Sequence, residues 1–173
     1  MNKARFTPAQ INAFSREEFV RVLGPVFESS PWIAKAAWAH RPFADLHQLH
    51  QALCRTVTGA GEARQIQLIQ AHPDLAGRAA IQGALTAESA GEQTSAGLNR
   101  LSGEEVALFQ SLNQSYREKF GFPFVICARR NQKDAILTSF RARLNHPRDR
   151  EVKTALAEIA RIARLRLEDL VTP

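Results

Sequence analysis

The chain has 173 residues, of which 45% are hydrophobic and 23% charged, and its formal net charge is +6. This length is sufficient for one domain with a hydrophobic core, and the composition excludes a chain that is disordered over most of its length. No apolar run approaches the roughly 20 residues that a membrane-spanning helix needs, so we expect no association with a membrane.

The ends of the chain and its cysteines bear on the cellular compartment. Residues Met1–Gln10 are polar and lack the apolar stretch of a signal peptide, and Leu170–Pro173 is not a peroxisomal ending. Cys54 and Cys127 are far apart, which favours two reduced, buried thiols over a disulfide framework or a zinc site; a catalytic thiol is the alternative. We expect a cytoplasmic protein.

Helix signals dominate the chain from beginning to end. Ser15 with Glu18 has the pattern of a capping box that opens a helix, and Ser102 with Glu105 repeats it. Asp45 is placed to cap a helix whose leucines recur at helical spacing. The predicted helices cover about residues 15–23, 31–39, 45–58, 63–70, 102–120, 134–144 and 149–171, with Asp134 as the cap of the sixth.

The predicted fold class is all-α, a single-domain helical bundle of about seven or eight helices that spans residues 1–173. The predicted helix content far exceeds the roughly one-third that is average for globular proteins. Val125–Cys127 is too short to decide between a strand and a buried coil. The pattern alone does not give the topology.

One arginine of the last predicted helix falls on its apolar face. Arg166 shares that face, whereas Arg161 and Arg164 lie off it. A charged side chain that faces a core is paired or binds something. Two interpretations are open: a structural one, with a buried arginine–carboxylate pair or an arginine that reaches past the core edge, and an arginine that binds an anionic or carbonyl-rich ligand. The apolar positions are Val152, Leu156, Ile159, Ala163 and Leu170.

A second unusual pattern places polar side chains together. Ser89, Glu92, Gln93 and Ala96 have the spacing of one helical face, and three of the four are polar. The face is either exposed to solvent or lines a polar pocket.

The histidines differ in how informative they are. His72 precedes Pro73, which disfavours the helical conformation, so His72 is expected at a helix end with its ring free to point into a cavity. A lone histidine is more often structural than catalytic. His47 and His50 lie three residues apart, but no third ligand at a recognisable spacing supports a metal site.

The basic charge raises a competing interpretation, a helical module that binds nucleic acid. Its densest stretch is Arg141–Arg150, and no aromatic residues alternate with these charges as they do on single-strand binding surfaces. A solvated face is therefore favoured. A third interpretation is a purely structural helical protein with buried ion pairs and no activity.

Four segments, taken in order, resemble the motifs of one enzyme family, the 2-oxo-4-hydroxy-4-carboxy-5-ureidoimidazoline (OHCU) decarboxylases. They are Ala71–Ala76, Glu92–Leu98, Lys119–Ile126 and the end of the last helix around Glu158–Ala160 and Leu165–Leu167. Their order and spacing match, and the resemblance covers essentially the whole chain.

The resemblance implies an all-α homodimer that needs neither a metal nor an organic cofactor and binds a small-molecule substrate rather than nucleic acid. The implied reaction converts OHCU to (S)-allantoin and carbon dioxide. The implied catalytic residues are His72 and Glu92, and the backbone of Phe122–Ile126 would bind substrate and form a wall of the site. The implied substrate-binding residues are Pro73, Ser89, Gln93, Phe122, Phe124, Val125, Ile126 and Arg166.

Overall fold

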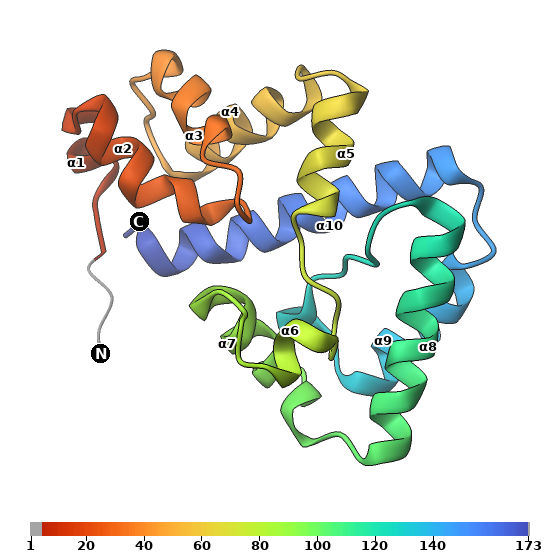
Figure 1. Cartoon of the computed structure of the whole chain (residues 1–173). Helices are drawn as coiled ribbons and strands as arrows, with labels where there is room; N and C mark the ends of the chain where they lie inside the picture. The colour runs from red at the N-terminus through yellow and green to blue at the C-terminus, as the bar shows by residue number, and fades with distance from the viewer. Residues whose placement is uncertain (1–4, 173) are drawn as a thin grey trace. The chain divides into compact units, whose positions relative to one another are not determined.

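The computed structural model describes residues 5–172, and its regular structure is helical (Figure 1). This range contains ten α-helices, seven of them with eight or more residues, and no strand; its one β pairing is an isolated bridge between Phe6 and Val171. The predicted all-α class is confirmed. Within residues 5–172, no helix is both long enough and apolar enough to cross a membrane.

The chain divides into two compact units. The first unit contains the residues up to Ala71 and those from Ala160 onward, and the second unit is His72–Ile159. The last helix, α10 (Arg148–Leu170), contributes residues to both units. The single domain over residues 1–173 stays a prediction.

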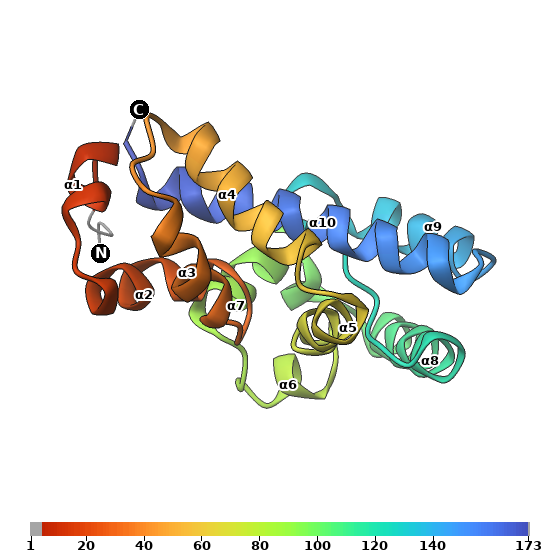
Figure 2. The same cartoon turned by 90° about the horizontal axis from the view of Figure 1, so that it is seen from above.

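In the first unit, short helices pack around phenylalanine and aliphatic side chains. Helix α3 packs against α2 and α4 (Figures 1 and 2). Phe19 and Phe43 stack with their ring centroids 6.2 Å apart, and Phe19, Ile33 and Leu53 are fully buried. The helices are α1 (Pro8–Ala13), α2 (Arg16–Leu23), α3 (Trp32–Ala37), α4 (Leu46–Thr58), α5 (Glu62–Gln70) and the end of α10.

The second unit has an aromatic core. Tyr116 is fully buried among phenylalanines, and Phe124 stacks on Phe140 with a centroid distance of 3.8 Å. Aromatic pairs in such geometries contribute about 0.5–1.5 kcal/mol beyond the burial of their area. The helices are α6 (Arg78–Ile81), α7 (Ala87–Ser95), α8 (Gly103–Phe120), α9 (Lys133–Arg143) and the first part of α10.

Side-chain caps explain where several of these helices begin. The predicted capping boxes at Ser15 and Ser102 are confirmed, and Asp45 caps α4 by accepting a hydrogen bond from the Gln48 amide. The predicted cap at Asp134 is wrong, because Gln132 precedes α9. Asp134 lies in the first turn, where its carboxylate interacts favourably with the positive end of the helix dipole.

Candidate active site

His72 lies in a turn between α5 and α6. Helix α5 ends at Gln70, two residues before His72, so the prediction that His72 sits at a helix end is confirmed. His72 is only 6% exposed, and Pro73 and Asp74 are half-buried. We call residues 72–76 the His72 turn.

Helix α7 carries the predicted polar face. Thr86 caps the helix by accepting a hydrogen bond from the Ser89 amide. Ser89 and Gln93 are 5% and 6% exposed, and Glu92 is half-buried. The face therefore points into the protein, and the interpretation of a solvent-exposed stripe is wrong.

Gln93 joins α7 to the His72 turn. Its Oε1 accepts a hydrogen bond from the Ala76 amide at 2.9 Å, and its Nε2 donates to the Asp74 carbonyl at 3.4 Å. The second unit thus brings together the two elements that carry His72 and Glu92, the predicted catalytic residues. These bonds hold the backbone of the His72 turn, a role of Gln93 that the sequence did not predict. They use one N–H and one acceptor position of the carboxamide.

The segment Phe122–Ile126 is a buried coil. Gly121 ends α8 in the left-handed conformation, with φ +79°, which glycine adopts at little cost. All five residues that follow are buried, and the Phe122 and Phe124 rings contact Tyr116 in the core. These two rings therefore lie in the core, and substrate binding by the backbone of the segment stays a prediction.

Two buried charged residues hold this segment in place. Arg143 Nη1 donates to the Val125 carbonyl at 2.8 Å, and the Cys127 amide donates to Glu158 Oε2 at 2.9 Å. Arg143 and Glu158 are 5% and 8% exposed. The backbone of the segment is therefore anchored on both sides of Ile126.

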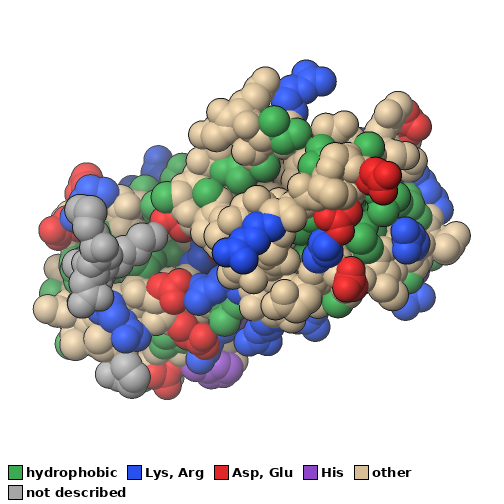
Figure 3. Space-filling model, turned by 90° about the horizontal axis from the view of Figure 1, so that it is seen from below, with side chains coloured by type: hydrophobic (Ala, Val, Ile, Leu, Met, Phe, Trp, Pro, Cys, Tyr) green, Lys and Arg blue, Asp and Glu red, His purple; other side chains and the backbone are tan. Residues whose placement is uncertain are grey.

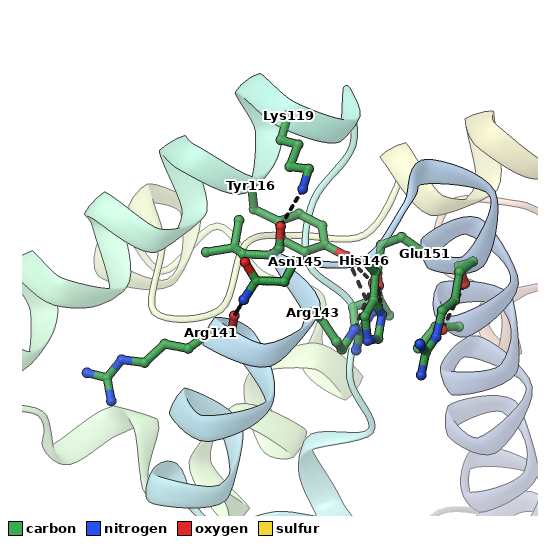
Figure 4. Close-up of polar contacts among 11 residues, drawn as sticks. Tyr116, Lys119, Arg141, Arg143, Asn145, His146 and Glu151 are labelled. Atoms are coloured by element: carbon green, nitrogen blue, oxygen red, sulfur yellow. Dashed lines mark hydrogen bonds and ion pairs between the residues drawn. The ribbon is translucent and has the colours of Figure 1, made fainter.

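Arg143 belongs to a polar cluster around Glu151, which is completely buried (Figure 4). Glu151 Oε1 accepts hydrogen bonds from Arg143 Nε at 2.7 Å and from the Tyr116 hydroxyl, and Oε2 lies 3.0 Å from His146 Nδ1. Burial raises the pKa of Tyr116, so its hydroxyl stays protonated and donates. The interpretation of Arg141–Arg150 as a solvated face is wrong for Arg143, because its buried carboxylate partner lies in the core.

Cys127 follows the segment and lies within the electrostatic reach of Glu92. Burial raises the pKa of the Cys127 thiol, and the carboxylates of Glu158 and Glu92 raise it further, against the opposing effect of Arg130. Burial also raises the pKa of Cys54. Because the thiolate is the reactive form, these shifts argue against a catalytic thiol.

Arg166 lies in the first unit, with only 4% of its surface exposed. Its Nη1 and Nη2 donate to Glu28 Oε2, each at 3.1 Å, and Nη1 donates to the Pro25 carbonyl at 3.2 Å. The helical phase was correct, since Arg161 is exposed and Arg164 half-exposed. These contacts are the buried arginine–carboxylate pair of the structural interpretation, and ligand binding by Arg166 stays a prediction.

Among residues 5–172, no group of three His, Cys, Asp or Glu side chains converges in a way that could hold a metal ion. His47 Nε2 pairs with the Gln51 carboxamide at 2.8 Å, and His50 Nε2 with the Ala160 carbonyl at 2.8 Å. Burial lowers the pKa of His50, which keeps the ring neutral.

Sequence reasoning missed the residues that hold the backbone of these elements. Glu151 and Glu158 have the helical phase of buried positions in α10, such as Ala155, Ile159 and Ile162. The phase test that singled out Arg166 would have found both carboxylates if it had been applied to acidic residues. Three more polar residues that hold these elements were also missed: Asn113, Arg117 and Arg143.

Comparison with known proteins shows the same family along almost the whole chain. The family model described as OHCU decarboxylase matches residues 12–168. A 2-oxo-4-hydroxy-4-carboxy-5-ureidoimidazoline decarboxylase of Halalkalicoccus jeotgali is 42% identical over 169 residues, which cover 98% of this chain and 94% of that protein. One of Amia calva is 45% identical over 162 residues, which cover 94% and 93%.

A solved structure has the same fold. The crystal structure of (S)-allantoin synthase superposes with a TM-score of 0.76 at 25% identity and covers 95% of this chain. The match covers 54% of that longer chain, so this chain spans about half its length. From the family model and the two relatives, we conclude that the chain belongs to the OHCU decarboxylase family.

Proposed function

We propose that this decarboxylase converts OHCU to (S)-allantoin and carbon dioxide, with His72 and Glu92 as its catalytic residues. The residue assignment rests on the two hydrogen bonds between Gln93 and the His72 turn. They join the elements that bear His72 and Glu92. Membership of the family supports the reaction.

The chemistry requires an acceptor for one electron pair and a source of one proton. When the bond between ring carbon 4 and the carboxylate breaks, the electron pair passes to the adjacent C=N bond of the ring. The nitrogen of that C=N bond takes up a proton. The 4-hydroxyl then loses a proton to become a carbonyl, and carbon 5 gains one, so the reaction consumes one proton overall. The protein has to orient the carboxylate, stabilise the developing charge and deliver the proton to one face, and such electrostatic placement is worth several kcal/mol.

The proposed roles follow the chemistry of each side chain. His72 is the general acid and base that exchanges a proton with the 4-hydroxyl or the nascent carbanion. Glu92 orients His72 or binds ureido N–H groups, and the free N–H of Gln93 binds an amide edge of the ring. Pro73, Ser89 and the backbone of Phe122–Ile126 shape the binding surface. Arg166 binds a carboxylate or carbonyl oxygen of the substrate.

The test follows optically active allantoin by circular dichroism after the protein is added to freshly hydrolysed 5-hydroxyisourate. We expect His72→Ala to lower kcat by about 100-fold or more, the range of a lost general acid–base group, while the fold survives. His40→Ala is the matched control, because His40 is exposed and lies in the first unit. Turnover by the wild-type protein no faster than the spontaneous, racemic reaction would contradict the proposed function; near-normal turnover by His72→Ala would remove the role of His72.

We further propose that the enzyme acts as a homodimer in the cytoplasm. The homodimer rests on the resemblance described above. The free thiols of Cys54 and Cys127 support a reducing compartment. Sedimentation equilibrium tests the dimer, and a mass of one chain across the working concentration range would contradict it.

A further inference from the structure

The His72 turn is bound by side chains of α8 as well as by Gln93. Asn113 Nδ2 donates to the Leu75 carbonyl at 2.9 Å. One helical turn further along α8, Arg117 Nε donates to both carboxylate oxygens of Asp74, at 2.9 and 3.1 Å. Together with Gln93, these bonds hold three consecutive residues of the turn, and the first of them lies two residues after His72.

Asn113 stabilises the turn at a cost to the protein's stability. It is 5% exposed, and its Oδ1 has no hydrogen-bond partner among the described residues. An unpaired buried oxygen destabilises the folded state. A side chain that served only to fill this space would carry no such oxygen, so the bond to Leu75 is what Asn113 contributes.

The backbone of the turn needs to be held. Ala76 has φ +49°, a left-handed conformation that alanine adopts only with strain. At the neighbouring Gly77, an added Cβ would lie 2.6 Å from the Asp74 Cβ, so the chain is also tightly folded back on itself. A conformation of this kind persists when the surrounding structure determines it, and clusters at functional sites.

We propose that Asn113 and Arg117 are positioning residues of the decarboxylation reaction. By holding Asp74 and Leu75, they fix the backbone that places His72 relative to Glu92 of α7. This inference rests on the proposed function. Neither side chain takes part in the proposed chemistry; each acts through the turn.

Arg117 offers the sharper test, because its side chain is 44% exposed and that of Asp74 is 26% exposed. An ion pair at this exposure contributes little to stability, so its removal leaves the fold intact. We expect Arg117→Ala to lower kcat about tenfold, since a small displacement of a catalytic group is costly, and to change KM less than twofold. The enantiomeric excess of the allantoin should fall with kcat, because the proton is then delivered less selectively to one face.

Five further variants separate positioning from a general effect of charge or packing. Arg141→Ala, an exposed arginine of the same unit, should behave as wild type. Asp74→Ala should match Arg117→Ala, and the double variant should be no worse than either single one, because both residues act through one interaction. Asn113→Leu should lower kcat in the same way, provided that it unfolds cooperatively. Arg117→Lys, which keeps a donor, should recover part of kcat.

The outcomes are distinguishable. If wild type is active and His72→Ala is inactive, but Arg117→Ala and Asp74→Ala keep kcat and enantiomeric excess within twofold, the positioning role is wrong and the proposed function stands. Additive losses in the double variant would also overturn it. If wild type forms no allantoin faster than the spontaneous reaction, the proposed function is wrong, and the positioning role falls with it.

Discussion

Among residues 5–172, two arginines are buried, and each faces a buried carboxylate. Arg166 pairs with Glu28 in the first unit, and Arg143 pairs with Glu151 in the second. Removing two charges from water costs more than their mutual attraction returns unless further hydrogen bonds satisfy them. Both arginines have such bonds, since each also donates to a backbone carbonyl. Removal of either partner would leave the other charge buried without its charged partner.

This changes what to expect of Arg166. Arg166→Leu fits the apolar face of α10 but leaves the Glu28 carboxylate buried without its arginine. We therefore expect the free energy of unfolding in urea to fall by about 3–5 kcal/mol. Loss of activity in this variant alone would not reveal ligand binding.

The double variant Glu28→Gln with Arg166→Leu separates the two effects. It should recover most of the stability and still lack activity, whereas Glu28→Gln alone keeps the arginine for the substrate. If the double variant turns over substrate as fast as Glu28→Gln, Arg166 is a structural residue only.

At this scale the sequence predicted which arginine is buried but not its partner. Helical phase depends on nearby residues, so it distinguishes Arg166 from Arg161 and Arg164. Glu28 is 138 positions away from Arg166 in the chain. Such a pairing is set by the tertiary fold, which a periodic pattern in one sequence does not encode.

Among the elements, the segment Phe122–Ile126 depends most on its neighbours. It has no helix or strand hydrogen bonds of its own, and its position comes from Arg143 of α9 and Glu158 of α10. A backbone surface intended to bind a ligand has to be fixed before the ligand arrives, since ordering it during binding would weaken affinity. The charged anchors therefore hold the backbone of the coil in place before a ligand binds.

Replacing Arg143 tests this arrangement. Arg143→Met should lower the free energy of unfolding by about 3–5 kcal/mol, because the Glu151 carboxylate would remain buried without its arginine. The double variant Arg143→Met with Glu151→Leu should recover most of that loss, as measured by urea unfolding. Arg141→Ala, an exposed neighbour on α9, serves as the control. Equal stability of wild type and Arg143→Met would contradict a buried, charged pair.

Local signals predicted several helices, although α1 was missed despite its Thr7–Gln10 capping box. The boxes at Ser15 and Ser102 and the cap at Asp45 were read correctly, because each involves residues within one turn. The four-residue helix α6 lacks a side-chain cap and has no periodic face to detect. Val125–Cys127 was undecidable because a buried strand and a buried coil have the same apolar composition.

The net charge of +6 belongs to the whole molecule, and its distribution matters more than its size. On the face in Figure 3, Lys and Arg side chains are interspersed with Asp and Glu. Pairs such as Arg117–Asp74 and Arg164–Glu168 offset part of the positive charge locally. A nucleic-acid surface instead gathers its positive charge in one patch or stripe.

We therefore expect weak salt dependence. From about 50 to 200 mM salt, kcat/KM for the anionic substrate should fall less than about threefold, because only long-range attraction is screened. A protein that contacts many phosphates loses about 1,000-fold or more in affinity over that range. Saturable binding of duplex DNA with a steep dependence on salt would support the competing interpretation of a nucleic-acid module.

The fold class was predictable because helical periodicity is local, whereas the division into two units was not. The first unit is assembled from both ends of the described chain, and the Thr172 amide donates a hydrogen bond to the Phe6 carbonyl at 2.9 Å. The second unit is contiguous. During synthesis on the ribosome, His72–Ile159 emerges complete and can fold first. Helices α1–α5 are synthesised before it, but the first unit also contains residues 160–172, so that unit is complete only after the second unit has been synthesised.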